Sequence, residues 1–462
     1  MAALCLTMLL PSLGTSIANV ALPALADAFD GSFQQVQWVV LAYLLATTTL
    51  VVPAGRLGDR IGRRRLLLGG TLLFTGASIW CGFAWDLPLL IAGRAAQGAG
   101  AAVLMALATA MAGDAAAKGG TGRAMGLLGT MSAIGTALGP TAGGALIAAF
   151  GWPAVFLVNV PLGLFAFLLA KRSLPADARR RAGHQPSFDV AGTVLLALTL
   201  GAYALAMTIG RGSFGAANVA LLAAAAAGAG WFALVELRAP APLVRLTMFR
   251  ARRLSAALTA NALVSAVMMA TLVVGPFYLA RGLGLNALLV GLAMSAGPLS
   301  VAAAGVPAGR LADRMGSARM AVAGLVAVGA GCALLSLVPA GFGIAGYVLP
   351  LAIVGGGYAL FQAANNSAVM SSAAAEERGL VAGLLNLVRN LGLVSGASVM
   401  GALFSWAGGS GSVGQADPES VAQATRFTFA VAAGVAAAAL AVAAAGRISP
   451  PLRRIGTFVQ AL

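Results

Sequence analysis

The chain has 462 residues and a formal net charge of +16, yet only 9% of its residues are charged and 60% are hydrophobic. A water-soluble domain carries about 25% charged residues, so this chain has too little polar surface to cover a folded protein in water. The composition therefore excludes an ordinary soluble protein and indicates a membrane protein.

Long apolar runs follow one another along the whole chain. A helix needs about 20 mainly apolar residues to cross the hydrocarbon core, and runs of this length without alternation are helices. The first run has no basic region and no cleavage site ahead of it, so we expect a retained span. Fourteen spans are predicted, at residues 2–26, 37–57, 66–85, 87–112, 122–150, 153–170, 190–210, 216–237, 254–280, 287–311, 320–339, 342–372, 379–406 and 425–445. The predicted fold class is thus an all-α integral membrane protein.

The basic residues set the expected orientation. With both termini in the cytoplasm, 24 of the 29 Lys and Arg fall in cytoplasmic segments and three on the opposite side, while Arg94 and Arg389 fall within spans. Cytoplasmic loops of membrane proteins are enriched in Lys and Arg. This split favours an even number of spans and explains the net charge without nucleic acid as a partner. High Ala and Arg content indicates a bacterial source, and hence the inner (cytoplasmic) membrane.

Two loops of the chain are copies of each other. Residues 55–65 follow the second predicted span, and residues 309–319 follow the tenth with seven of eleven positions identical. Parallel repeats with a substrate site between them are a transporter architecture. We expect these loops to form a latch that closes one face, through Gly55, Asp59, Arg60, Gly62, Arg63, Gly309, Asp313 and Arg314. The arginines alone could act only as topology determinants, but the aspartates are not needed for that.

Three motifs resemble those of a known family. The GRLxDRxGRRR loop is similar to the signature between spans two and three of the major facilitator superfamily, and fourteen spans resemble its drug:proton antiporter branch. Residues 90–100 are similar to the family's RxxQGxG motif. The GxxxGPxxGG antiporter motif resembles a stretch of the fifth span that includes Gly135, Gly139, Pro140, Gly143 and Gly144.

This resemblance implies the domain organisation of a major facilitator fold. Residues 1–171 and 254–446 would form two six-helix bundles. Residues 172–253 would hold linkers and an inserted pair of helices, spans seven and eight, and residues 447–462 a cytoplasmic tail. In span five, the glycines at every fourth residue predict a smooth stripe for close helix packing. By the resemblance, the motif seals the outward side of an antiporter.

The two arginines within spans are candidate functional residues. A guanidinium at such depth is costly, so it should face a cavity or a partner. Arg94 is expected in proton coupling and Arg389 in the cavity; the alternative is that each is tied to backbone carbonyls and fixes helix packing. The other predicted cavity residues are polar and lie within spans: Asn19, Tyr43, Gln97, Gln362, Asn365 and Asn366. The last three share one helical face.

The relatives of this family usually carry an acidic residue in span one where this chain has Gly14. All thirteen acidic residues lie in loops or near helix ends. Asp27 and Asp30 in the outer vestibule are therefore the alternative proton carriers. A cavity with arginine and no acid predicts neutral or anionic amphipathic substrates.

The expected function is export of drug-like or amphipathic small molecules by proton antiport with alternating access. The alternative is export of one specific endogenous metabolite or lipid-like compound. We expect no cofactor, no metal and no catalytic residues, since three isolated cysteines and one histidine offer neither ligand spacing nor a nucleophile–base pair. A primary pump is disfavoured because no GxxxxGK[ST] loop occurs. The expected partners are substrate, protons and the lipid bilayer, with a monomeric protein.

Overall fold

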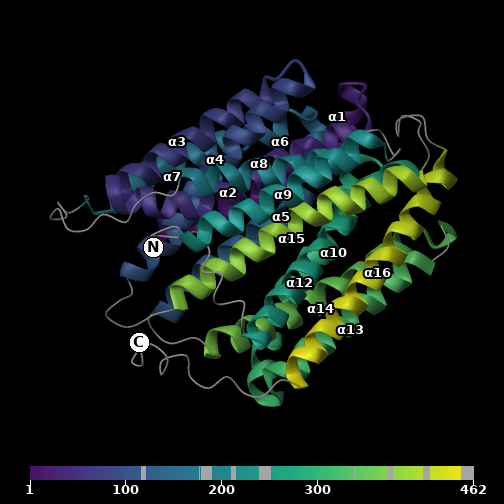
Figure 1. The fold of residues 1–462 in the computed structure, drawn as a ribbon. Helices are drawn as coiled ribbons and strands as arrows, with labels where there is room; N and C mark the ends of the chain where they lie inside the picture. Colours follow the sequence, from purple (N-terminus) through teal and green to yellow (C-terminus); the bar gives the residue numbers. More distant parts are fainter. Residues whose placement is uncertain are drawn as a thin grey trace.

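The computed structural model describes residues 1–115, 121–175, 177, 190–209, 215–238, 251–337, 340–372, 378–408 and 417–448. Within these residues every regular element is a helix, which confirms the predicted all-helical class (Figure 1). Almost all of the predicted tail, residues 449–462, and most of the predicted linkers lie outside the described residues.

The helices form three groups along the chain. A first helix group comprises α1 (Ala2–Ala28), α2 (Phe33–Ile61), α3 (Arg63–Gly82), α4 (Leu87–Ala115), α5 (Thr121–Phe150), α6 (Ala154–Leu157) and α7 (Asn159–Ser173). A pair follows, α8 (Val190–Thr208) and α9 (Ala216–Arg238). The second helix group comprises α10 (Arg252–Val273), α11 (Gly275–Phe277), η2 (Tyr278–Gly282), α12 (Ala287–Met315), α13 (Ser317–Leu337), η3 (Ala340–Phe342), α14 (Gly343–Ser372), α15 (Arg378–Ala407) and α16 (Pro418–Ile448).

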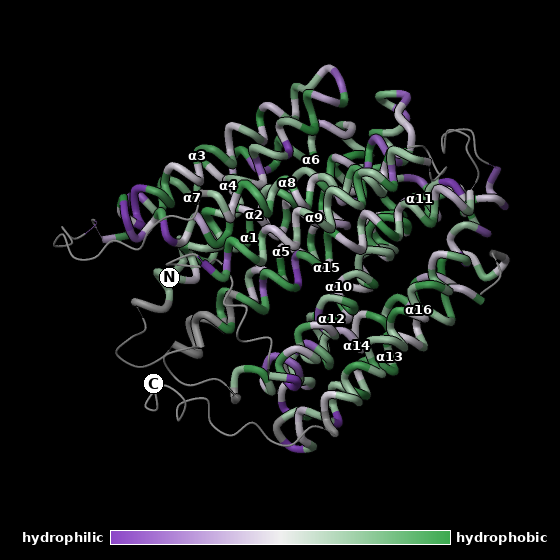
Figure 2. Tube along the Cα trace, viewed as in Figure 1, coloured by the Kyte–Doolittle hydropathy of each residue, from purple (hydrophilic) through white to green (hydrophobic). Residues whose placement is uncertain are grey.

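The long helices have the length and composition of membrane spans. Among the described residues, thirteen helical segments are long and apolar enough to cross a bilayer, and α3, which opens on three arginines, is not one of them. Hydrophobic residues fill the middle of the helices, and hydrophilic residues collect toward their ends (Figure 2). The molecule is thus a multi-pass membrane protein, while the count of fourteen spans stays a prediction.

The two helix groups repeat one packing pattern. In the first group α1 packs on α5, α2 on α4, and α3 on both α4 and α7. In the second group α10 packs on α15, α12 on α14, and α13 on both α14 and α16. The sequence repeat therefore has a counterpart in the order in which the helices pack.

The copied loops also share a backbone conformation. Gly62 ends α2 with φ 107° and Gly316 ends α12 with φ 89°, and each amide donates to the carbonyl four residues earlier, at 3.1 Å. Positive φ is accessible to glycine but strained for residues with a side chain. The glycine at this place in both copies is thus required by the sharp turn into the next helix.

Two predicted spans are interrupted in the structure. Residues 153–170 were expected as one helix, but α6 ends at Leu157 and α7 begins at Asn159. Pro161 has no N–H for the carbonyl four residues earlier, which is that of Leu157. Residues 254–280 were also expected as one helix. There α10 ends at Val273 before Pro276, and a π-helical turn follows at Tyr278–Gly282.

The α8–α9 pair lies beside both helix groups. The two helices pack on each other, and α8 also packs on α2 and α15. Trp38 Nε1 of α2 donates to the Thr208 hydroxyl at 3.0 Å, and the Tyr203 hydroxyl lies close to Ser395 of α15. The pair therefore covers the line where α2 and α15 meet.

We predict that Gly316→Ala destabilises the protein by about 1–3 kcal/mol, because alanine is strained at this backbone conformation. A Cβ at Gly316 would meet no atom within 4 Å, so a steric clash makes no contribution. Gly305→Ala is the matched control, since Gly305 is helical and its Cβ would also lie in open space. Thermal unfolding in detergent should show a lower Tm for Gly316→Ala only. Equal Tm values for the two variants would contradict the strain argument.

Candidate functional site

The two helix groups touch directly where α5 meets α12. A Cβ on Gly144 would collide with the Ala287 carbonyl oxygen and lie 3.0 Å from Gly291 Cα, so the two backbones are in contact. Beside this contact the hydroxyls of Thr141 and Ser295 form a hydrogen bond. Such an approach is possible only for small residues.

A second contact joins α2 to α15 and α11. The Phe33 ring lies 4.8 Å from that of Phe277 and 4.9 Å from that of Phe404, and all three side chains are buried. Next to them Gln34 donates to the Ser405 hydroxyl and Gln37 to the Ala397 carbonyl. Residues from both helix groups thus form an aromatic and amide plug.

An ion pair joins the groups at the same end of the molecule. Arg281, in the π-helical turn, pairs with Asp27 at the end of α1. Together with the plug and the α5–α12 contact, this pair closes what we call the closed end. Asp27, a predicted proton carrier, is therefore bound to the opposite helix group here.

Toward the other end α5 and α12 lose contact. Gly129 lies three helical turns from Pro140 on the same face of α5, and Gly305 and Gly309 lie four and five turns from Gly291 on the same face of α12. The Pro140 carbonyl abuts Gly291, but a Cβ on any of the other three glycines would meet no atom within 4 Å. Among the described residues, the faces that touch at the closed end are thus open at these three glycines, toward the end that carries the copied loops.

The predicted latch residues of the first copy make contacts inside their own helix group. Arg63 Nε and Nη2 both bind Asp59 Oδ1, at 2.8 Å. Arg60 is exposed, and a Cβ on Gly55 would meet no atom within 4 Å. In the second copy Gly309 is similarly open and Arg314 is exposed, while the Asp313 side chain lies outside what the structure describes. The latch stays a prediction.

The sequence analysis missed Asp177, which binds the first copied loop from another part of the chain. Asp177, from the segment after α7, accepts hydrogen bonds from the Arg64 amide at 2.8 Å and the Arg65 amide at 3.1 Å. Its carboxylate also abuts Gly62. It therefore caps the positive N-terminal end of α3. The feature of the sequence that could have indicated this cap is an acidic residue shortly after the basic end of predicted span six.

The glycine stripe of α5 packs on α1. Cβ atoms on Gly135 and Gly139 would collide with α1 at Leu9 and Ser16, and one on Gly143 would lie 2.9 Å from Ile17 Cγ1. The Ser16 hydroxyl donates to the Gly135 carbonyl at 3.1 Å. Gly135, Gly139 and Gly143 thus hold the first helix group together, while Pro140 and Gly144 of the same motif contact the second.

Arg94 is completely enclosed within the first helix group. Its Nε donates to the Val39 carbonyl at 2.8 Å, and its Nη1 donates to the Gly14 carbonyl at 3.3 Å and to the Gln97 side chain. Its Cζ lies 4.2 Å from the centre of the Tyr43 ring, a cation–π contact. One side chain on α4 therefore ties α1 and α2 together, which matches the packing alternative stated for it.

Three predicted cavity residues are also fully buried beside Arg94. Gln97 donates to the Ser78 hydroxyl at 2.7 Å, Tyr43 donates to the Pro11 carbonyl at 2.9 Å, and Asn19 donates to the Thr15 carbonyl at 3.1 Å. Asn19 Oδ1 has no hydrogen-bond partner. In this conformation Gln97, Tyr43 and Asn19 lie in helix packing and line no accessible space.

The second helix group places its candidates differently. Asn365 is buried, Gln362 is half-buried and Asn366 is exposed, so their shared helical face spans the edge of the core. Gln362 Nε2 donates to the Tyr358 hydroxyl at 2.8 Å. Arg389 is half-buried. Three of their polar atoms are buried without a hydrogen-bond partner, Gln362 Oε1, Asn365 Nδ2 and Arg389 Nε, as Arg94 Nη2 and Asn19 Oδ1 are in the first helix group.

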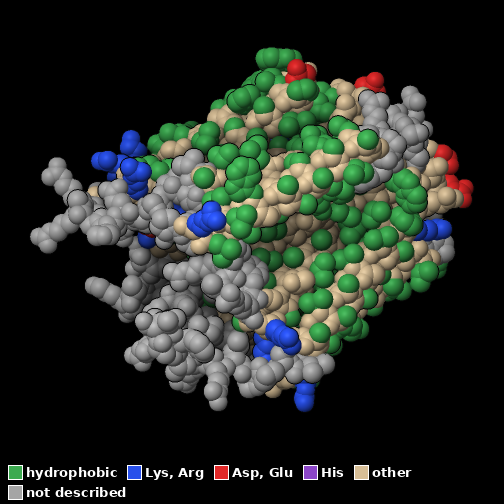
Figure 3. All heavy atoms as spheres, in the orientation of Figure 1, with side chains coloured by type: hydrophobic (Ala, Val, Ile, Leu, Met, Phe, Trp, Pro, Cys, Tyr) green, Lys and Arg blue, Asp and Glu red, His purple; other side chains and the backbone are tan. Residues whose placement is uncertain are grey.

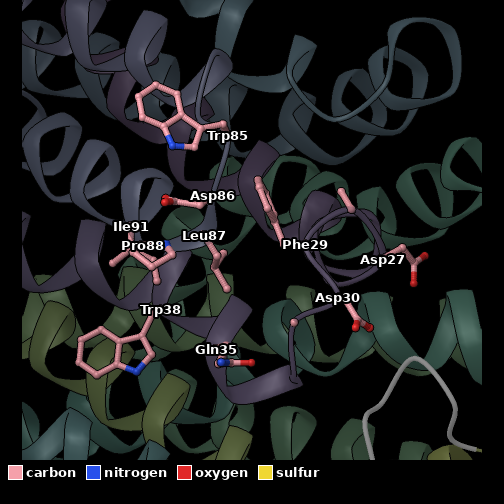
Figure 4. A pocket seen from close by; sticks show the side chains of 12 residues that line it. Asp27, Phe29, Asp30, Gln35, Trp38, Trp85, Asp86, Leu87, Pro88 and Ile91 are labelled. Atoms are coloured by element: carbon pink, nitrogen blue, oxygen red, sulfur yellow. The ribbon is translucent and has the colours of Figure 1, made fainter.

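Asp30 lies at the closed end in an outer pocket of about 590 Å³ that also includes Asp27, Asp86, Trp38 and Trp85. Figure 4 shows Asp86 and Trp85 across Phe29 from the two other carboxylates. Asp30 itself has φ 47°, a strained turn position after α1. Figure 3 shows acidic side chains at this end of the displayed face and most basic ones toward the opposite end.

Comparison with known proteins finds relatives that match most of the chain. The family model "Major Facilitator Superfamily" matches residues 4–397 and 257–458. The transporter YebQ of Escherichia coli is 32% identical, over 86% of each chain. The riboflavin transporter RibZ of Clostridioides difficile is 29% identical, over 87% of each chain. The multidrug resistance protein Stp of Mycobacterium tuberculosis is 31% identical, over 84% of this chain and 72% of its own.

Among solved structures, a bacterial homolog of the human lysosomal transporter Spinster, in an inward-facing and occupied conformation, has a similar fold. Its TM-score is 0.71 at 15% identity, and the match covers 96% of each chain. An identity this low supports the shared fold alone.

We predict that Arg94→Lys destabilises the first helix group by about 3 kcal/mol or more, because lysine cannot reproduce the guanidinium's bonds to two backbone carbonyls and a glutamine. Loss of folded protein on heating, followed by size-exclusion chromatography, measures this effect. Arg281→Lys, at the exposed ion pair, should change Tm little. If Arg94→Lys keeps wild-type stability but uncouples transport from the pH gradient, the packing role is refuted and proton coupling is favoured.

Proposed function

The chain belongs to the Major Facilitator Superfamily, and from this we propose that it exports drug-like or amphipathic small molecules by proton antiport, with a substrate site that opens to each face in turn. That it is a membrane transporter and not an enzyme follows from its family and fold. The direction of transport, the drug-like substrates and the coupling to protons are the proposal.

The observation that supports this proposal is that the two helix groups are joined at the closed end of the molecule. Glycine backbones, an aromatic plug and an ion pair join the groups at the closed end, and the same faces of α5 and α12 are bare at the other. Two groups joined in this way can rock about their contact, which exposes a shared site to one face at a time. In this proposal the end opposite the closed end is cytoplasmic, because the basic copied loops lie there.

The proposed architecture has fourteen spans in the bacterial inner membrane, with both termini cytoplasmic. It divides them into six-helix bundles at residues 1–171 and 254–446, joined by an inserted pair. The repeated packing pattern supports the two bundles, and the position of α8 beside both α2 and α15 supports an insertion at their boundary. The protein would act as a monomer with the proton gradient as its only energy source.

Export of a single metabolite is the alternative function. One relative is named a riboflavin transporter and another a multidrug resistance protein, so the family resemblance fits either breadth of substrates. The polar residues left without partners in the second helix group favour a site that recognises specific groups. Resistance of expressing cells to several unrelated compounds would separate the two functions.

Transport by the purified full chain in proteoliposomes tests the proposal. With an imposed pH gradient, we expect movement of amphipathic compounds that stops when the gradient is collapsed by an ionophore. The expected preference is for neutral and anionic compounds over cations. Transport that persists without any gradient, or that follows a gradient of another ion, would refute proton antiport. Asp27→Asn with Asp30→Asn tests these two carboxylates, since unchanged coupling would exclude them as proton carriers.

We predict that locking the closed end stops transport. Thr141→Cys with Ser295→Cys places two thiols where two hydroxyls now form a hydrogen bond. The background should carry Cys5→Ala, Cys81→Ala and Cys332→Ala, since these native cysteines are free. Oxidation should form the cross-link and abolish transport, and reduction should restore it.

Each single-cysteine variant is the control and should transport under both conditions. Full activity of the cross-linked protein would contradict alternating access through the α5–α12 contact.

A further inference from the structure

Arg389 lies near the middle of α15 with no hydrogen-bond or ion-pair partner among the residues that the structure describes. Its Nε is enclosed, although the side chain as a whole is half-buried. A guanidinium that lies within a span, with one nitrogen enclosed and no partner, is costly in a membrane protein. The position therefore calls for a counterion.

The neighbours of α15 show where Arg389 points. Leu385 and Gly392 face α10, Ala397 faces α2, and Ser395 faces α8. At about 100° per residue, Arg389 lies between the strip that faces α10 and the strip that faces α2, on the side away from Ser395. It is thus directed into the space between the two helix groups, not toward the inserted pair.

Asn365 of α14 approaches the same place. Phe361 and Val369, one turn on either side of it, belong to buried clusters that contain Val264 and Leu258 of α10, respectively. Asn365 therefore faces α10 near Asn261, which lies between those two α10 residues. The Asn365 side chain is only 5% exposed and has no hydrogen-bond partner in the described part of the chain.

Asn261 connects this pair to α15. Its Nδ2 donates to the Leu385 carbonyl at 3.2 Å, one helical turn from Arg389, and its Oδ1 has no partner. Asn390, next to Arg389, is 6% exposed and also makes no hydrogen bond to any described residue. Asn261 is thus bonded to the turn of α15 that precedes Arg389, Asn390 adjoins Arg389 in the chain, and Asn365 comes from the helix that packs on the other side of α10 at this level.

This set of groups has the chemistry of a carboxylate site. A guanidinium offers a planar pair of N–H donors that matches a carboxylate, and the unused Nδ2 of Asn365 adds a further donor, whereas the unused atom of Asn261 is its acceptor Oδ1. The helices α10, α14 and α15 contain no Asp or Glu that could neutralise the charge internally. Arg94 does not compete for an anion, because its side chain is completely enclosed, with Nε and Nη1 bound to two carbonyls and Gln97, although Nη2 has no partner.

We propose that Arg389, with the amide N–H groups of Asn365 and Asn390, binds the carboxylate of an amphipathic organic anion that the protein carries. The site rests on the proposed transport function and narrows its substrate class to compounds with a carboxylate and an apolar body. The second helix group then holds the charged end of the substrate.

Equilibrium binding to the purified full chain in lipid nanodiscs tests the site with two fluorescent probes, dansylglycine and dansylglycinamide. They differ only in a carboxylate and its neutral amide. The wild-type protein should bind dansylglycine about tenfold or more tightly than the amide, the scale of one charge-assisted hydrogen bond. Arg389→Gln should remove this preference by weakening dansylglycine alone, and Arg389→Lys should keep part of it.

Arg426→Gln on α16 is the matched control and should keep the full preference. The site is refuted if the wild-type protein shows no preference or binds neither probe, if Arg389→Gln leaves the preference unchanged, or if folded Arg389→Gln loses both probes equally. Binding needs no pH gradient. An intact carboxylate preference in a protein that fails to transport would therefore refute the proposed export and leave the site standing.

Discussion

The contact of glycine backbones between α5 and α12 is the constraint on which the rest of the arrangement depends. In a bilayer, helices gain little from burying apolar side chains, so they associate where small residues allow close packing. Gly144 and Gly291 provide such a place at one end of the boundary, with a hydroxyl pair beside it. Because the remaining length of both helices is free of this contact, the two groups can separate at the other end without unfolding.

The two arginines within the membrane spans show that one residue type has two different roles in this protein. Arg94 binds carbonyls of α1 and α2 and Gln97 through Nε and Nη1, with only Nη2 left without a partner, so its charge organises the first helix group. Arg389 has no such partners and faces the space between the groups. Arg94 is therefore held in helix packing by three hydrogen bonds, whereas the described residues offer Arg389 none.

The α8–α9 pair and the segment around Asp177 connect parts of the two helix groups. Trp38 of α2 donates to Thr208 of α8, and Ser395 of α15 lies close to Tyr203 of α8, so the pair follows the boundary between the groups. Asp177 fixes the start of α3, within the first copied loop. The segment that leaves the first group is thereby anchored at the end of the molecule where the groups are apart.

The sequence by itself determined the helical class, the positions of nearly all long helices and the copied loops, because span length, apolar composition and glycine turns are local properties. It could not place the breaks that precede Pro161 and Pro276 exactly, since proline bends or breaks a helix according to its packing. Nor could it distinguish Arg94 from Arg389, which look alike in a list of polar residues within spans. Only the tertiary structure decided that difference, because whether a buried guanidinium is satisfied depends on carbonyls and side chains from helices far away in the chain.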